Sequence, residues 1–128
     1  MLNSALMQLE YPAGDGSGTA VEFAIDPAKF HDAFAADVPE EEAAVMAATQ
    51  RPVSAFGFTE RNGAPAWKTL PSWAVVATGD KAAGSDVVRR MAERAGATIT
   101  EVEASHVVMV SRPEAVTEVI RQAVDSVG

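Results

Sequence analysis

The sequence contains no cysteine, and this absence excludes disulfides, zinc–thiolate sites and thiol nucleophiles. Basic residues are also few, because 10 Lys and Arg stand against 18 Asp and Glu, for a formal charge of −8. Binding to a phosphate backbone depends on clustered Lys and Arg, so the composition argues against a nucleic-acid partner. The lack of cysteine fits a reducing compartment.

The N-terminus lacks the basic start and the long apolar run of a targeting segment, since the chain reaches Glu10 before any such run. It therefore predicts neither a signal peptide nor a membrane span, and we expect a cytoplasmic protein without a membrane partner. A length of 128 residues predicts a single domain that buries roughly 65–70% of its unfolded surface without needing cross-links.

The first half of the chain, residues 1–65, predicts a hairpin followed by short helices. Segments 7–11 and 19–25 flank a glycine-rich turn, and the second alternates apolar and polar residues as a half-buried strand does. Asp26-Pro27 predicts the start of a helix that ends near residue 36. Asp37, with Glu40 three residues later, predicts the capping box of a second helix that ends near Gln50.

The second half, residues 66–128, predicts a βαβ unit followed by a helix. The apolar run 72–78 is typical of a strand buried on both faces of a parallel sheet. A helix over residues 85–95 and a more polar strand over 98–102 complete the unit. Ser111-Arg112-Pro113-Glu114 predicts a capping box that starts a last helix, whose apolar stripe should pack on the sheet.

Two other groups of polar residues carry little functional signal. His31 lies off the apolar face of its helix and has no second metal ligand at a suitable spacing, so we interpret it as a surface histidine. Glu40, Glu41 and Glu42 fall in the first turn of a helix, where the helix dipole favours carboxylates. We therefore predict no metal site there.

Asp80 and His106 are the candidate catalytic residues, because each follows one of the two predicted parallel strands. Loops at the carboxyl ends of such strands meet at one edge of the sheet, where α/β proteins place their chemistry. An aspartate beside an imidazole fixes its tautomer and stabilises its protonated form, which is the orienter–base part of a nucleophilic triad. The alternative is that Asp80 is only a turn or capping residue.

The order of these motifs resembles the C-terminal part of the α/β-hydrolase superfamily, especially its esterase-like and cofactor-free haloperoxidase-like members. The motifs are a strand ending in Ala77-Thr78-Gly79-Asp80, a helix, a second strand, Ser105-His106 and a helix that opens with Ser111-Arg112-Pro113-Glu114. Segment 39–71 is similar to the helical cap of the same family. The resemblance implies a partial α/β-hydrolase fold of class α/β, with Asp80 and His106 in the positions of the catalytic acid and histidine. It implies no cofactor and no metal.

The chain has no Gly-x-Ser-x-Gly motif, which marks the nucleophilic serine of this superfamily. A complete serine-hydrolase mechanism therefore cannot be assembled from these residues. Three interpretations stay open: a truncated or split hydrolase that supplies Asp80 and His106, a cyclase or isomerase with His106 as general base, and a non-catalytic binding or interaction protein. An apolar small molecule is a possible ligand, in a pocket that would be lined by Phe30, Phe34, Met46, Phe56, Phe58 and Trp67. The alternative is that these residues only form the core.

The strand over residues 72–78 has only one predicted neighbour, and an apolar strand with a free edge needs a cover. Three covers are open: the same strand of a second copy, the N-terminal hairpin folded back, or a complementing N-terminal half. We favour the homodimer, because a two-fold axis at the edge needs no further partner.

Overall fold

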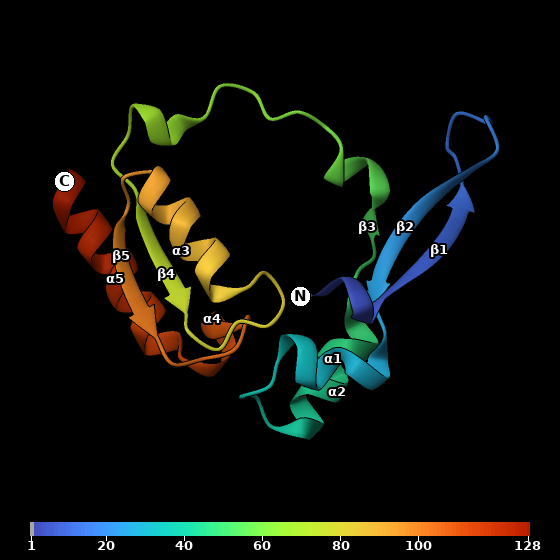
Figure 1. Ribbon diagram of the computed structural model, residues 1–128, viewed down its shortest axis with the longest axis horizontal. Helices are drawn as coiled ribbons and strands as arrows, with labels where there is room; N and C mark the ends of the chain where they lie inside the picture. Colours follow the sequence, from blue (N-terminus) through green and yellow to red (C-terminus); the bar gives the residue numbers. More distant parts are fainter. Residues whose placement is uncertain (1) are drawn as a thin grey trace.

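The structure, a computed structural model, describes residues 2–128, with side chains from Ser4 onward. It consists of two lobes joined by an arched linker (Figure 1). We call residues 2–58 the N-terminal lobe and residues 73–127 the C-terminal lobe. The linker contains the short 3₁₀ helix η3 (Ala66–Lys68).

The N-terminal lobe is built on a three-stranded antiparallel sheet in the order β1-β2-β3. The predicted hairpin is confirmed as β1 (Leu6–Pro12) and β2 (Thr19–Ile25). The third strand, β3 (Val53–Ser54), pairs with the other edge of β2. The 3₁₀ helices η1 (Leu2–Ala5) and η2 (Ala55–Phe58) adjoin this sheet in the chain.

Two helices pack beside this sheet. The predicted cap of α1 (Pro27–Phe34) is confirmed, because a carboxylate oxygen of Asp26 accepts a hydrogen bond from the backbone N–H of Ala28 at 3.0 Å. The predicted cap of α2 (Glu40–Thr49) is wrong, because Pro39 occupies that position without a side-chain hydrogen bond. The carboxylate of Asp37 is buried in a tertiary contact instead, which is described below.

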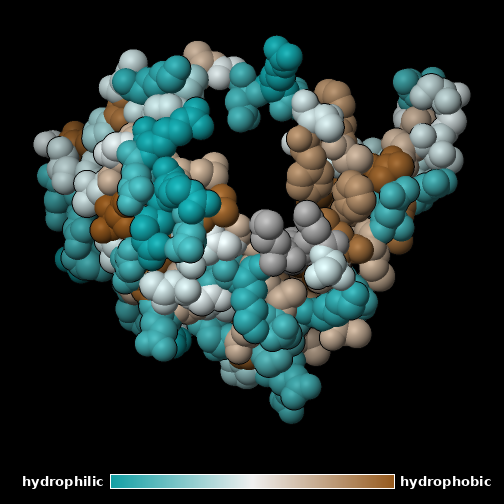
Figure 2. All heavy atoms as spheres, viewed as in Figure 1, coloured by the Kyte–Doolittle hydropathy of each residue, from teal (hydrophilic) through white to brown (hydrophobic). Residues whose placement is uncertain are grey.

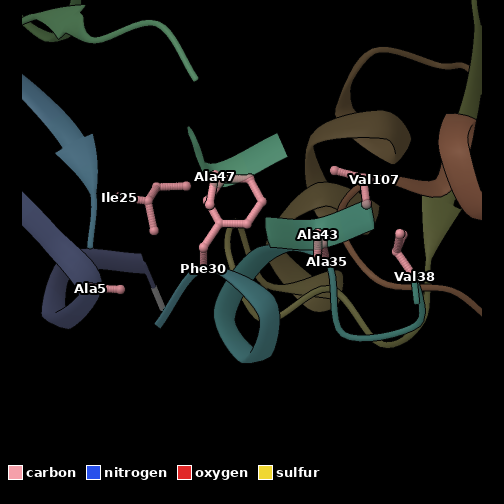
Figure 3. Packing of buried hydrophobic residues seen from close by; sticks show 8 residues of the cluster. All are labelled: Ala5, Ile25, Phe30, Ala35, Val38, Ala43, Ala47 and Val107. Atoms are coloured by element: carbon pink, nitrogen blue, oxygen red, sulfur yellow. The ribbon is translucent and has the colours of Figure 1, made fainter. Parts of the chain in front are cut away.

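The largest cluster of buried apolar residues lies between α1, α2 and the hairpin (Figure 3). It consists mostly of small side chains around one aromatic ring, and its members are Ala5, Ile25, Phe30, Ala35, Val38, Ala43, Ala47 and Val107. Val107 belongs to the C-terminal lobe and directly follows His106. The two lobes therefore share this core at the histidine.

The C-terminal lobe contains the predicted βαβ unit. Strands β4 (Trp73–Ala77) and β5 (Thr98–Val102) pair in parallel and are connected by α3 (Ser85–Arg94). Helices α3 and α5 flank the strand pair (Figure 1). Val76 in β4 is fully buried, as expected for a strand covered on both faces.

Backbone pairing continues beyond the two strands toward the candidate residues. The N–H of Thr78 donates to the carbonyl of Val102 at 2.9 Å, and the N–H of Gly79 donates to the carbonyl of Ala104 at 3.0 Å. The loops that carry Asp80 and His106 are thus held together at the carboxyl end of the strand pair.

The other edge of β4 pairs with no strand in residues 2–128. Ser72 and Thr78 bond to the β5 side, and backbone groups alternate in direction along a strand, so those of Val75 and Ala77 point to the free edge. The N-terminal hairpin does not cover this edge, because it forms a separate sheet with β3. The expectation that the N-terminal hairpin folds back and covers β4 is therefore wrong.

The last helix differs from the prediction in its start and its packing. A short helix, α4 (Val108–Ser111), precedes α5 (Pro113–Val127), and Arg112 rather than Ser111 is the N-cap. Val119 is buried, whereas Ile120 and Val124 are 58% and 61% exposed. The capping box is therefore wrong, and only the first half of the apolar stripe packs on the sheet, because two strands offer too narrow a face.

No helix within residues 2–128 combines the length and the apolar content that a bilayer crossing requires.

Replacing Gly79 by alanine tests how tightly the two loops approach each other. A Cβ at this position would lie 2.9 Å from the carbonyl oxygen of Ala104, which is backbone and cannot yield cheaply. We expect Gly79→Ala to lower the free energy of unfolding by about 1–3 kcal/mol in urea denaturation. Gly63→Ala is the matched control, since nothing lies within 4 Å of its added Cβ. Equal stability of the two variants would contradict the close approach.

Candidate active site

Asp80 and His106 hydrogen-bond to each other at the rim of the β4–β5 pair. The imidazole Nδ1 lies 2.9 Å from the Oδ2 of Asp80. The Oδ1 of Asp80 accepts hydrogen bonds from the backbone N–H groups of Ala82 at 2.8 Å and Ala83 at 2.9 Å. The contact that strand spacing predicted is thus present, and the backbone fixes the carboxylate from its far side.

The carboxylate is buried while the imidazole is accessible, with side chains 6% and 35% exposed. Burial raises the pKa of Asp80. The hydrogen bond and charge of His106 and the N–H groups of Ala83 and Ala82 lower it by more, so the pKa lies below the ordinary value of 3.8. Asp80 is therefore an ionised acceptor at neutral pH.

An ionised Asp80 selects the form of the imidazole that a general base needs. The carboxylate can only accept, so Nδ1 carries the proton, and Nε2 of the neutral ring is left with a lone pair. Nε2 has no hydrogen-bond partner among the residues that the structure describes. The pair can therefore accept a proton at Nε2 and stabilise the resulting positive charge.

A cavity of about 640 Å³ lies between the lobes, where Figure 2 shows a hollow, and His106 forms part of its wall. The ring of Phe34 packs against the imidazole with centroids 4.7 Å apart. The rest of the wall is mainly apolar and comes largely from the N-terminal lobe, including Leu6, Phe23, Ile25, Phe30, Met46, Val53 and Phe58.

The predicted lining of this cavity is right for four residues and wrong for two. Phe30, Phe34, Met46 and Phe58 line it, but Phe56 does not, and Trp67 lines a separate cavity of about 320 Å³ beside α3. The sequence reasoning missed the contribution of the hairpin. The alternation of apolar residues in β2 predicted a buried face, but it did not predict that this face lines the cavity.

No serine among the described residues hydrogen-bonds to His106. The hydroxyl of Ser105, the nearest in sequence, is buried, and that of Ser72 donates to the carbonyl of Leu70 on the surface. His31 is half-buried rather than a free surface residue, with Nε2 2.9 Å from the carbonyl oxygen of Val38. Residues 2–128 contain no group of three or more His, Asp or Glu side chains that could hold a metal ion.

The chain was compared with known families, curated proteins and solved structures. A model described as the alpha/beta hydrolase family matches residues 3–119. The structure of polyneuridine aldehyde esterase is similar over 88% of this chain, with a TM-score of 0.74 and 17% identity. A histidine-to-alanine mutant of that esterase gives a TM-score of 0.71 and 14% identity, also over 88% of this chain. No curated protein matches.

The similarity to the solved structures shows a shared fold, and it covers only part of them. This chain matches 46% of the esterase chain in both structures, so it spans about half the length of the proteins it resembles. The observed architecture is accordingly a partial α/β-hydrolase fold.

Replacing Asp80 by asparagine tests the charge of the pair. The amide can still accept from the two backbone N–H groups, but it presents an N–H group instead of an acceptor to the imidazole. Because the folded pKa is lowered, the carboxylate contributes stability above the ordinary value of 3.8, and this contribution is lost as pH falls through the folded pKa.

We therefore expect Asp80→Asn to cost about 1–3 kcal/mol at pH 7 and less at a pH near 3, as measured by urea denaturation. Asp125→Asn, on an exposed part of α5, is the control and should change little at either pH. A stability difference between wild type and Asp80→Asn that stays constant from pH 7 to 3 would contradict the lowered pKa.

Proposed function

The chain belongs to the α/β-hydrolase family, and on this premise we propose that it supplies the acid and base of a hydrolase triad, Asp80 and His106. The nucleophilic serine then comes from outside these 128 residues. The observation that carries the proposal is the hydrogen-bonded pair, whose free Nε2 stands beside an apolar cavity. The half-length match to an esterase supports it as well.

In the proposed chemistry, His106 accepts a proton and gives it back once in acylation and once in deacylation. His106 Nε2 takes the serine proton as the serine oxygen attacks an ester carbonyl, and Asp80 stabilises the imidazolium. His106 then gives that proton to the departing alcohol, which leaves an acyl-serine. A water molecule then attacks the acyl-serine and gives its proton to Nε2, and His106 returns that proton to the serine oxygen as the acid is released. The oxyanion hole, which carries much of the catalytic power, also has to come from the complementing part.

The cavity favours an ester with an apolar body. Its wall is mainly aromatic and aliphatic, and a volume of about 640 Å³ accommodates a small organic molecule. The name of the similar esterase indicates an ester substrate for that protein, which agrees with this class. Absence of cysteine fits action in the reducing cytoplasm.

A second candidate is proton transfer without a covalent step, as in an isomerase or cyclase. It is favoured because residues of this chain form both the Asp80–His106 pair and the cavity wall. No described serine hydrogen-bonds to His106, and proton transfer alone needs none. A third, non-catalytic binding in the same cavity, needs no proton transfer at all. Only the first of the three requires an acyl-serine intermediate.

Complementation tests the split triad. The chain is co-expressed with a segment that carries a Gly-x-Ser-x-Gly turn, taken from the same or a neighbouring reading frame. We expect a fluorophosphonate probe to label the serine of that segment and p-nitrophenyl butyrate to be hydrolysed. His106→Ala should lower turnover by about 10³-fold or more. His31→Gln, which changes the other histidine, should retain it.

The chain alone should neither be labelled nor hydrolyse the ester above the His106→Ala background. Labelling of a serine within these 128 residues would show that the nucleophile lies in this chain and would refute the split triad.

We also propose that the free edge of β4 is an assembly surface. The N–H and C=O of Val75 and the N–H of Ala77 have no strand partner in residues 2–128, whereas the carbonyl of Ala77 accepts a hydrogen bond from the N–H of Asp80 at 3.3 Å. Unpaired edges of apolar strands promote association. The half-length match supports a strand of the complementing half as the partner. A second copy of the chain is the alternative, and it would form a homodimer.

Light scattering at micromolar concentration tests this surface. We expect the isolated chain to be heavier than its monomer mass of 13.4 kDa and to form a one-to-one complex with a complementing half. Ile120→Ser and Val124→Ser, which remove exposed apolar groups on α5, should leave the association unchanged if the edge is responsible. A monodisperse monomer of the isolated chain that also forms no complex with the complementing half would contradict edge pairing.

A further inference from the structure

Asp37, between α1 and α2, contributes a buried carboxylate that the proposed chemistry does not use. Both of its carboxylate oxygens are inaccessible to solvent, and so are the hydroxyl oxygens of Ser105 and Ser111. The two serines come from the other lobe. A buried carboxylate without compensation is costly, so this cluster needs a physical reason.

The dipoles of the two serine hydroxyls offset part of that cost. Burial raises the pKa of Asp37, but the hydroxyls of Ser105 and Ser111 and the backbone of Ser105 lower it by more, so the pKa lies below its ordinary value. None of these donors reaches the carboxylate with full hydrogen-bond geometry in the structure. The hydroxyls can rotate about their C–O bonds, and turned toward the carboxylate they favour its ionised form.

Ser105 and Ser111 lie at the two ends of the segment that carries His106. Ser105 directly precedes the histidine, and Ser111 is the last residue of α4. A single buried carboxylate of the N-terminal lobe is therefore influenced by the hydroxyls at both ends of segment 105–111.

Further contacts join the same parts of the two lobes. Val38, next to Asp37, and Val107, next to His106, belong to one buried cluster (Figure 3). Phe34 packs on the imidazole, with ring centroids 4.7 Å apart. The loop of Asp80 is attached as well, since the Nζ of Lys81 lies 2.6 Å from a carboxylate oxygen of Asp32. The C-terminal end of α1 and the segment that follows it thus lie beside the loops that carry the acid–base pair.

We propose that Asp37 is a positioning residue, whose carboxylate holds segment 105–111 against the N-terminal lobe and so fixes the imidazole of His106 between Asp80 and the cavity. It acts through Ser105 and Ser111 and contacts no substrate. The inference rests on the proposed function, because the position of His106 matters to catalysis only if His106 is the base.

The consequence is that the cavity and the base form one preassembled unit. The N-terminal lobe supplies most of the cavity wall, and Asp37 joins that lobe to the histidine. A displacement of the lobe would therefore shift segment 105–111 and with it the imidazole of His106.

The test is nitrogen-15 NMR of the imidazoles in the full 128-residue chain carrying Asp37→Asn. The chain has only two histidines, so His31→Gln assigns both sets of signals. In the wild type, the hydrogen bond to Asp80 enriches the form of His106 protonated at Nδ1. In the variant, we expect the share of this form to fall at least about twofold, because the bond that selects it is weakened.

His31 is the internal control. Its Nε2 bonds to the carbonyl of Val38, next to Asp37, so its signals report whether the segment between α1 and α2 keeps its shape. A positioning role requires the signals of His106 to change while those of His31 do not. Equal changes at both histidines would show that Asp37 only maintains the local fold, and would overturn the proposal.

Ser111→Ala keeps the test decisive where Asp37→Asn fails to fold, since it removes one hydroxyl and leaves the carboxylate. It should change the His106 signals in the same direction by a smaller amount. Ser126→Ala, which removes an exposed hydroxyl bonded to the carbonyl of Gln122 within α5, should have no effect. Unchanged His106 signals in Ser111→Ala and Asp37→Asn, even with lowered stability, would overturn the proposal.

These NMR signals can be measured without the nucleophilic serine and without catalytic turnover. The NMR result and the complementation result can therefore fail independently of each other.

Discussion

The parallel pairing of β4 with β5 is the constraint on which the candidate site depends. It continues past both strands to the hydrogen bond between Gly79 and Ala104, where the backbones approach so closely that a Cβ on Gly79 would lie 2.9 Å from a carbonyl oxygen. Asp80 directly follows Gly79, and His106 comes two residues after Ala104. The contact between Gly79 and Ala104 therefore brings Asp80 beside the imidazole of His106. The short hydrogen bond between the two side chains is thus a consequence of backbone register and of a glycine that permits it.

The packing of the chain shows which surfaces are incomplete. The buried residues are mainly alanine and valine, and Val76 is the largest fully buried side chain among residues 4–128. Larger apolar side chains are exposed instead, among them Leu70, Met91, Ile120 and Val124. Burial of apolar area is the main favourable term in folding, so a chain that leaves its large side chains in water gains little from it. This pattern is expected of a partial fold whose remaining strands and helices would cover these groups.

Local sequence patterns predicted the elements of this fold well where the residues of a pattern take part only in local structure. The apolar run of β4, the proline-marked start of α1 and the positions of Asp80 and His106 after parallel strands all follow from periodicity and spacing. The patterns failed where a residue satisfied a local motif but took part in a tertiary contact. Asp37 and Ser111 each begin a capping box in the sequence, yet the side-chain oxygens of both are buried and cap no helix.

The cavity was predicted less completely for a related reason. Phe30, Phe34 and Met46 follow from the apolar faces of two helices. Phe56 lies in the short helix η2 and Trp67 in the linker, and neither segment has a periodic signal. The contribution of β2 could not be predicted because the partner of its apolar face lies far away in sequence.

The geometry of the free edge bears on where a missing nucleophile could enter. A strand that pairs with β4 in the parallel direction would end at the same rim as Asp80 and His106, because parallel strands share their carboxyl ends. A turn that follows such a strand, or the next strand beyond it, would then face the same rim as the lone pair of His106 Nε2. An antiparallel strand from a second copy would instead bring its amino end to that rim and place its own Asp80 and His106 at the opposite end. The two partners therefore differ in a way that matters for chemistry, since only the parallel arrangement can bring the turn after a strand to the base.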